Sequence, residues 1–126
     1  MEPTGKPYKI RHATPADAAF IRNLIWQVKI NPIGLNWRRF VVAVLDPGSN
    51  IGCAQLKVHK DGSRELASVA VMPLYRHQGV AEKLILEILN DQQPPIYLTC
   101  RSSLRGFYER FGFSELLDLV AGMGEV

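Results

Sequence analysis

The N-terminal part of the chain carries one strand pattern followed by one helix pattern. Residues 8–12 alternate between hydrophobic and polar side chains, which predicts a short strand. Thr14, Pro15 and Asp17 then supply the capping threonine, first-turn proline and first-turn acid of a helix start. Hydrophobic residues at helical spacing predict that this helix runs to about Lys29. They are Ala18, Phe20, Ile21, Leu24, Ile25 and Val28.

Three strands are expected next. Residues 40–45 form an unbroken hydrophobic run, residues 51–59 a second strand, and residues 64–72 a third strand that a proline ends. Turn residues separate these runs, and the Asp61-Gly62 pair is a hairpin signal. Short turns between successive strands predict an antiparallel meander.

The second half of the chain returns to helical spacing. Residues 80–90 predict an amphipathic helix, and residues 96–100 predict a short central strand after a pair of prolines. A last helix is expected at about 104–110, followed by one possible strand at 113–120. The resulting order β-α-β-β-β-α-β-α-β predicts an α+β, or mixed α/β, domain built on one sheet.

The last predicted helix has its own boundary residues. Ser102 or Ser103 can cap its start, because a serine oxygen accepts a bond from a first-turn N–H group. Gly112 is expected to close it, because glycine readily adopts the left-handed conformation at a helix end.

Composition adds limits on class and location. The 126 residues are 47% hydrophobic and 21% charged, which fits a single domain over residues 1–126 with tails at 1–7 and 121–126. Hydrophobic runs are too short for a membrane helix, and no secretory signal is visible, so a cytoplasmic protein with no membrane partner is expected. The net charge of +3 is too small to indicate a nucleic-acid partner.

Cysteine and histidine suggest no metal chemistry. Cys53 and Cys100 each lie in a hydrophobic run, which predicts buried free thiols in a reducing compartment. His12, His59 and His77 are scattered without metal-ligand spacing, so no metal is expected.

The segment 68–81 combines a strand, a proline, a basic loop and a glycine before a helix. The first N–H groups of a helix have no partners within it, and they bind phosphate well. Gly79 has no Cβ and so allows close approach to the backbone, while Arg76 adds a positive charge. The plainer reading is a glycine at a helix start beside an exposed arginine.

Three motifs occur in a fixed order along the chain. They are Ile10-Arg11-x-Ala13-x-x-x-Asp17, Val71-x-Pro73-x-Tyr75-Arg76-x-x-Gly79-x-Ala81 and Phe107-Tyr108-Glu109-Arg110-Phe111-Gly112-Phe113. The first resembles the opening strand and helix of the GNAT family of N-acetyltransferases. The second resembles the acetyl-CoA-binding signature of that family, and the third its aromatic signature near the C-terminus. The resemblance covers about residues 8–113.

The resemblance implies a fold and a cosubstrate. It implies one mixed sheet, mostly antiparallel, with a central splayed parallel pair formed by the strand ending near Val71 and residues 96–100, flanked by three to four helices. Acetyl-CoA would lie in that wedge, where Val69 and Val71 would contact it and the N–H of Val71 or of its neighbours would polarise the acetyl carbonyl. Its pyrophosphate would be held by Arg76, His77, Gln78, Gly79, Val80 and Ala81.

The resemblance also implies two proton-transfer residues. Tyr108 matches the general acid of the family, and a phenol near pKa ~10 can protonate a leaving thiolate. The alternative for Tyr108 is a core tyrosine within an aromatic cluster.

Glu65 falls where several family members carry a base. A strand period of two would give it one face with Ala67, Val69 and Val71. A solvated carboxylate beside Arg64 is the alternative for Glu65, and His59 is a competing base.

Three arginines stand where acceptor contacts are possible. Arg101 replaces an asparagine that is frequent in the family, so it removes one expected contact and could bind a phosphate or an acidic acceptor. Arg38 and Arg39 lie in the segment where the family recognises its acceptor, and they could bind a carboxylate. The alternative for this pair is a solvated basic strand start.

These features predict an acyltransferase that moves an acetyl group from acetyl-CoA to a small-molecule or peptide amine. The alternative is a catalytically silent acyl-CoA-binding domain that acts through protein contacts. The short C-terminus predicts a homodimer that uses the edge beyond residues 96–100 or the Leu116-Leu117 patch, with a monomer as the alternative.

Overall fold

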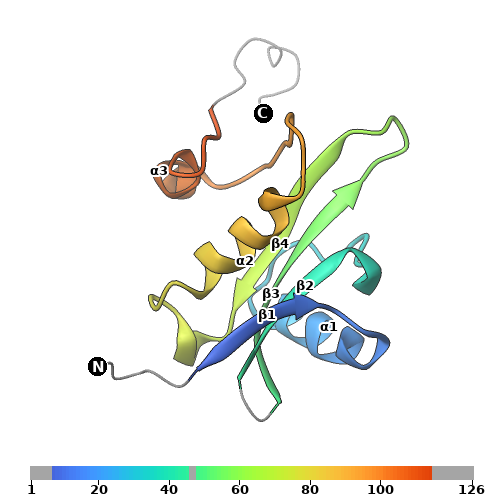
Figure 1. Ribbon diagram of the computed structural model, residues 1–126, viewed down its shortest axis with the longest axis vertical. Coiled ribbons are helices and arrows are strands. Elements are labelled where there is room, and N and C mark those ends of the chain that lie inside the picture. Colours follow the sequence, from blue (N-terminus) through green and yellow to red (C-terminus); the bar gives the residue numbers. More distant parts are fainter. Residues whose placement is uncertain (1–6, 46–47, 115–126) are drawn as a thin grey trace.

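The computed structural model describes residues 7–45 and 48–114, which form a four-stranded antiparallel sheet with helices packed around it (Figure 1). Each strand lies beside the strand that precedes it in the chain, which confirms the predicted meander. The strands are β1 (Tyr8–His12), β2 (Phe40–Leu45), β3 (Ser49–Val58) and β4 (Arg64–Val71). The helices are α1 (Ala18–Gln27), α2 (Val80–Asn90) and α3 (Arg105–Glu109). The predicted α+β class is confirmed.

Hydrophobic side chains fill both faces of the sheet. On one face, Val41 and Leu56 pack with α2, and on the other face Val42 and Cys53 pack with α1 (Figure 1). Because both faces are covered, all six residues of β2 are buried, which explains the unbroken hydrophobic run in its sequence. Burial also raises the pKa of the Cys53 thiol to about 12.

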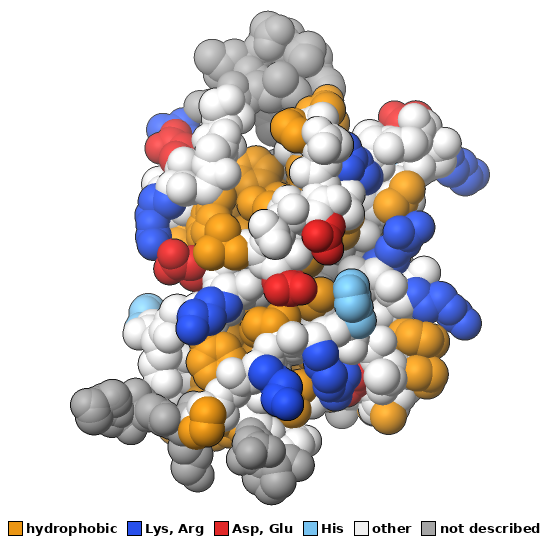
Figure 2. All heavy atoms as spheres, in the orientation of Figure 1, with side chains coloured by type: hydrophobic (Ala, Val, Ile, Leu, Met, Phe, Trp, Pro, Cys, Tyr) orange, Lys and Arg blue, Asp and Glu red, His pale blue; other side chains and the backbone are white. Residues whose placement is uncertain are grey.

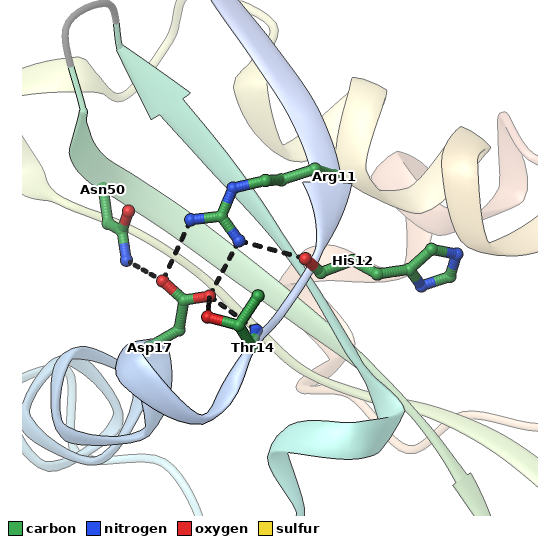
Figure 3. Close-up of polar contacts among 5 residues, drawn as sticks. All are labelled: Arg11, His12, Thr14, Asp17 and Asn50. Atoms are coloured by element: carbon green, nitrogen blue, oxygen red, sulfur yellow. Dashed lines mark hydrogen bonds and ion pairs between the residues drawn. The ribbon is translucent and has the colours of Figure 1, made fainter.

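The start of α1 is fixed by a buried carboxylate (Figure 3). Asp17 accepts two bonds from the Arg11 guanidinium, at 2.8 and 3.1 Å, and one from the Asn50 amide at 2.9 Å. It also accepts the backbone N–H of Thr14 at 2.7 Å, in a short 3₁₀ turn (Pro15–Asp17) that leads into the helix. These contacts tie β1, α1 and β3 together at one point.

The end of α1 comes two residues earlier than the sequence predicted. Lys29 has a φ of 59°, so it lies in the left-handed region and cannot continue the helix. Its N–H bonds to the Trp26 carbonyl at 3.2 Å, and the Ile30 N–H bonds to the Ile25 carbonyl at 3.4 Å. This pair of bonds is a Schellman motif, with lysine in the position that glycine usually takes.

An extra residue interrupts β4. Cys53 of β3 lies opposite Ala70, but Gln55 lies opposite Ala67, so two residues of β4 face the single Ala54. This is a β-bulge, and Ser68 within it has a φ of 56°.

The bulge overturns one prediction about β4. Ahead of it, Glu65 and Ala67 share a sheet face with Gln55, whereas Val69 and Val71 pack with the α2 cluster on the other face. The predicted common face for these four β4 residues is therefore wrong, because the inserted residue reverses the alternation.

Residues 96–100 do not form the predicted central strand. Tyr97 makes one parallel bridge to Glu65, through the bonds Leu66 N–H to Tyr97 O (2.8 Å) and Tyr97 N–H to Arg64 O (2.9 Å). Within the described residues, no further backbone bond joins this segment to β4. A parallel contact therefore exists, but it is limited to the single bridge between Tyr97 and Glu65.

The cysteine prediction is half wrong. Both cysteines are free thiols, but Cys53 is buried and Cys100 is exposed. Cys100 lies beyond the single bridge at Tyr97, where no neighbouring strand covers the segment within the described part of the chain.

The C-terminal helix α3 is shorter than predicted. Ser102 and Ser103 do not cap it, because they lie inside a preceding 3₁₀ turn whose N-cap is Arg101. Gly112 has the positive φ (96°) that the sequence predicted, but it lies two residues beyond the C-cap Arg110 and does not itself end the helix. The predicted strand at 113–120 is not seen at Phe113 or Ser114, and its remainder lies outside the described residues.

Two further observations concern ligands and membranes. Among residues 7–45 and 48–114, no group of three or more His, Cys, Asp or Glu side chains could hold a metal ion. No helix in that part of the chain is both long and hydrophobic enough to span a bilayer.

Candidate active site

The second half of β4 presents an open strand edge. The Met72 N–H donates to the Ile51 carbonyl at 2.8 Å, so it points toward β3. Alternation along a strand turns the backbone groups of the preceding Val71 the other way, toward the side where residues 98–100 leave the sheet. The Val71 N–H is therefore directed away from β3, to the side where no strand of the described residues pairs with it, as a donor for an extended ligand must be.

The loop after β4 is held against this edge. It begins with a 3₁₀ turn (Pro73–Tyr75), and the Arg76 Nε then donates to the Val71 carbonyl at 3.0 Å. Gln78 Nε2 contacts the Leu74 carbonyl at 3.4 Å. Arg76 thus fixes the end of the loop to the end of the strand in addition to carrying a positive charge.

The loop leads into α2 through two residues with positive φ. His77 has a φ of 63° and Gly79, the N-cap of α2, a φ of 82°. A Cβ built on Gly79 would meet no atom of residues 7–45 or 48–114 within 4 Å, so these residues leave the space above the glycine open. His77, Gln78 and Gly79 are exposed, whereas Val80 is buried in the α2 cluster and anchors the helix start.

The start of α2 can therefore hold an anion. Its first N–H groups lack partners within the helix, and the dipole favours negative charge there. The glycine leaves the approach open, so the residues fit a phosphate group.

Tyr108 lies in α3, on the hydrophobic cluster that α2 shares with β4. Its ring makes edge contacts with Phe107 at 5.1 Å and with Phe113 at 6.2 Å between centroids. Burial raises the pKa of Tyr108 above its ordinary value of 10, and the nearby Cys100 adds to the rise. Figure 2 shows hydrophobic side chains reaching the surface in the region of α2 and α3, bordered by charged groups.

The two expectations for Tyr108 are compatible. The ring takes part in the aromatic cluster, and the phenol keeps its proton at neutral pH, as a general acid must.

Glu65 lies near the start of β4, beside a histidine. The Glu65 Oε1 is 2.9 Å from the Nε2 of His59, across the β3–β4 hairpin. The Glu65 side chain is 26% exposed and that of His59 48% exposed. The two proposed bases therefore form one hydrogen-bonded pair. Arg64 turns away from them and donates to the Gln92 side chain at 2.7 Å.

A pocket of about 370 Å³ adjoins this pair. It lies between the β3–β4 hairpin and residues 97–99, the segment whose Tyr97 bridges to Glu65. The pocket offers both charged and neutral polar groups. Its lining residues are His59, Asp61, Ser63, Arg64, Glu65, Tyr97, Leu98 and Thr99.

The three predicted acceptor arginines lie outside that lining. Arg38 stacks its guanidinium on the Trp37 ring, 4.6 Å from the centroid, in a 3₁₀ turn (Trp37–Arg39) before β2. Arg38, Arg39 and Arg101 are all exposed. The stacking of Arg38 holds its charge at the surface beside an aromatic ring.

Sequence reasoning missed three features of this region. The bulge at Ser68 has no periodicity signal, because a single inserted residue looks like ordinary strand sequence. The buried amide of Gln55 and the pairing of His59 with Glu65 depend on strand register. The pairing of His59 with Glu65 could have been found by counting residues across the predicted Asp61-Gly62 hairpin.

The fold is shared with solved acetyltransferases. Rv2747 from Mycobacterium tuberculosis, solved with CoA and NLQ, is 23% identical, with a TM-score of 0.73, over 86% of this chain and 72% of its own. A protein from Xanthomonas campestris that is assigned to the GNAT family is 17% identical, with a TM-score of 0.73, over 97% of this chain and 95% of its own. N-acetylglutamate synthase from Neisseria gonorrhoeae, complexed with coenzyme A and N-acetyl-glutamate, is 24% identical, with a TM-score of 0.69. The match covers 82% of this chain but only 28% of the synthase.

The family itself is identified by sequence. The model of the acetyltransferase (GNAT) domain matches residues 36–115, which is more than half of the chain. The chain therefore belongs to the GNAT acetyltransferase family, as its three motifs indicated. No curated protein matches it.

Proposed function

We propose that this chain transfers an acetyl group directly from acetyl-CoA to an amine acceptor. The observation that carries the proposal is the open edge of β4, where the Val71 N–H points away from β3 beside an anion-binding helix start. Membership of the GNAT family supports an acyltransferase. The edge of β4 would offer backbone N–H donors to a thioester, next to a site for the phosphates of the same molecule.

The backbone of β4 would bind and polarise the thioester. The N–H group of Val71 would donate to the carbonyl oxygen, where negative charge develops during attack by the amine, and the backbone of Val69 would bond to the pantetheine part of acetyl-CoA. The loop from Arg76 through His77, Gln78, Gly79 and Val80 to Ala81 would hold the pyrophosphate. The role of Arg76 there is partly indirect, because its Nε is bound to Val71.

Tyr108 would supply the proton that the leaving thiolate takes up. Its raised pKa keeps the phenol neutral at rest, so the hydroxyl can donate when the thiolate forms.

Glu65 would accept the proton of the attacking ammonium, directly or through water. Its bond to His59 gives that proton a second group to which it can pass.

The acceptor would be a small-molecule or peptide amine. The pocket beside Glu65 supports an acceptor that enters next to the hairpin. Among structures with this fold, glucosamine-6-phosphate N-acetyltransferase from Arabidopsis thaliana (16% identical, TM-score 0.61) and the Neisseria synthase act on quite different molecules. Arg38, Arg39 and Arg101 remain proposed contacts for an acidic group of the acceptor.

A turnover assay separates this function from a silent CoA-binding domain. The purified chain would be incubated with acetyl-CoA and panels of amines, and acetylated product would be detected by mass spectrometry. Product formation that Tyr108→Phe suppresses supports the transferase. Tight CoA binding without any product would instead favour the silent domain.

A further inference from the structure

Gln55 is a fully buried polar side chain at the centre of β3. It is 1% exposed, and among the described residues only Asp17 is another buried polar or charged residue. A buried amide must be hydrogen-bonded at both ends to avoid a large desolvation cost. Its partners therefore show what the residue is for.

Each end of the Gln55 amide has a partner whose role as donor or acceptor is fixed. The Nε2 group lies 3.0 Å from the Gly34 carbonyl, which can only accept, so the amide donates there. The Oε1 atom then faces Ser68 Oγ at 3.0 Å, and the hydroxyl must donate to it. The side chain thus forms a directed chain from Ser68 through Gln55 to Gly34.

Ser68 is the strained residue of the β4 bulge, with a φ of 56°. A residue other than glycine adopts this conformation only at a cost in free energy, so surrounding contacts must hold it. The Ser68 hydroxyl donates to Gln55, and the Cys53 thiol lies 3.6 Å from the Ser68 carbonyl oxygen. Both contacts come from the same face of β3.

Gly34 belongs to the loop between α1 and β2. Besides the bond from Gln55, this loop receives a bond from Lys57 Nζ to the Ile33 carbonyl at 3.1 Å. Leu35 of the same loop packs on the hydrophobic cluster under α1. The loop therefore rests on alternate residues of β3, and its position is set by them.

We propose that Gln55 is a positioning residue that couples the loop at Gly34 to the bulge at Ser68, and through the bulge orients the Val69 and Val71 N–H groups. A displacement of the loop withdraws the Gly34 carbonyl from Gln55, and the amide then loses its hold on the Ser68 hydroxyl. The proposal rests on the proposed function only for its effect on acetyl transfer. The coupling itself exists in the free protein.

Amide NMR of the free protein tests the coupling without any turnover. Ser68→Ala, a mild change, is expected to shift the Gly34 and Leu35 amide signals as well as those of Val69 and Val71. In a Gln55→Met background, Ser68→Ala should leave the Gly34 signal where it is, because the connection is already cut. The control is Ser63→Ala, which removes a hydroxyl bonded to Asp61 in the hairpin and should not move Gly34.

Kinetics supply the second arm. Gln55→Met and Ser68→Ala should each lower kcat about tenfold, since misdirected donors weaken transition-state binding, and leave KM for acetyl-CoA within about twofold. A Gly34 signal that ignores Ser68→Ala overturns the coupling, whatever the activity. Wild-type protein that acetylates no amine contradicts the proposed function instead, and the NMR result stands apart from it.

Discussion

At the scale of single residues, Tyr108 carries the proposed acid role. Tyr108→Phe removes the hydroxyl and keeps the ring contacts, so kcat should fall at least tenfold while the Kd of CoA stays nearly constant. Because the pKa of Tyr108 is raised, wild-type activity should not decline through its ionisation below about pH 10. Steady-state kinetics and calorimetry measure both quantities.

The matched control for that change is Tyr8→Phe. Tyr8 packs on the same hydrophobic cluster, and its buried hydroxyl has no hydrogen-bond partner among the residues that the structure describes. Its loss should leave kcat unchanged. Equal kcat values for the Tyr108 variant and the wild type would exclude the acid role.

Glu65 makes a prediction about pH. In Glu65→Gln the base is lost, so kcat/KM should drop about tenfold or more at pH 7, where most amine acceptors are protonated. At pH 9 the loss should shrink, because free amine is already available. A Glu87→Gln variant, on the exposed side of α2, is the control. A loss that is the same at both pH values would argue against a base.

Asp17 governs stability rather than chemistry. Bonds from Arg11, opposed by burial and assisted by Thr14 and Asn50, hold the pKa of Asp17 well below its ordinary value of 3.8. A lowered folded-state pKa stabilises the protein above about pH 4, and this contribution is lost as the pH falls further. Asp17→Asn should cost about 2–3 kcal/mol at pH 7 in urea unfolding, and less at pH 2.5, where part of the contribution of the carboxylate is already lost.

The control for Asp17 is Asp61→Asn, in the exposed hairpin turn. It should change the free energy of unfolding at pH 7 by less than about 0.5 kcal/mol. If the two variants were equally stable at pH 7, the network in Figure 3 would not anchor the helix as described.

At the scale of elements, Gly79 decides whether the loop and α2 form an anion site. Gly79→Val places a β-branched side chain at a φ of 82°, in the open space above the helix start. The Kd of CoA, measured by calorimetry, should rise at least tenfold. Gly62→Val, at a φ of 87° in the hairpin turn, introduces the same backbone conflict elsewhere and should not weaken CoA binding.

If both glycine variants bound CoA equally, the site would not lie at the start of α2. Circular dichroism would first establish that each variant is folded.

The elements differ in how well the sequence predicted them. The three-strand meander and the helix Val80–Asn90 follow from hydrophobic periodicity, since both faces of the sheet are covered by helices. The early end of α1 could not be predicted, because Lys29 takes a conformation that glycine normally signals. Residues 96–100 have the composition of a strand, but composition does not show how many of them hydrogen-bond to β4, and only Tyr97 forms a bridge.

For the candidate site, local sequence pattern indicates residues that are close in the chain but not partners that are distant in it. Gly79 and Arg76 stand in a local motif, and the structure brings them to the end of β4 through the Arg76–Val71 bond. Glu65 was wrongly predicted to share a sheet face with Val69 and Val71, because one inserted residue at Ser68 reverses the alternation without any change in composition. Long-range partners such as Gln55 and Gly34 are invisible to local pattern.

At the scale of the whole molecule, the proposed site draws on distant parts of the chain. β4 supplies donors, the loop into α2 supplies the anion site, and α3 supplies the phenol. The hairpin between β3 and β4 adds the Glu65–His59 pair. The proposed acetyl transfer would therefore require the folded domain. The predicted dimer contact at Leu116-Leu117 lies outside the described residues.

The most direct test of acetyl transfer is product formation from acetyl-CoA by the intact chain. Across a panel of small-molecule and peptide amines, mass spectrometry should find at least one product heavier by one acetyl group, formed together with free CoA. Tyr108→Phe should slow that reaction at least tenfold, and Tyr8→Phe should not. A chain that bound CoA yet formed no acetylated amine would contradict acetyl transfer, and a Tyr108→Phe variant as fast as the wild type would contradict the acid role of Tyr108.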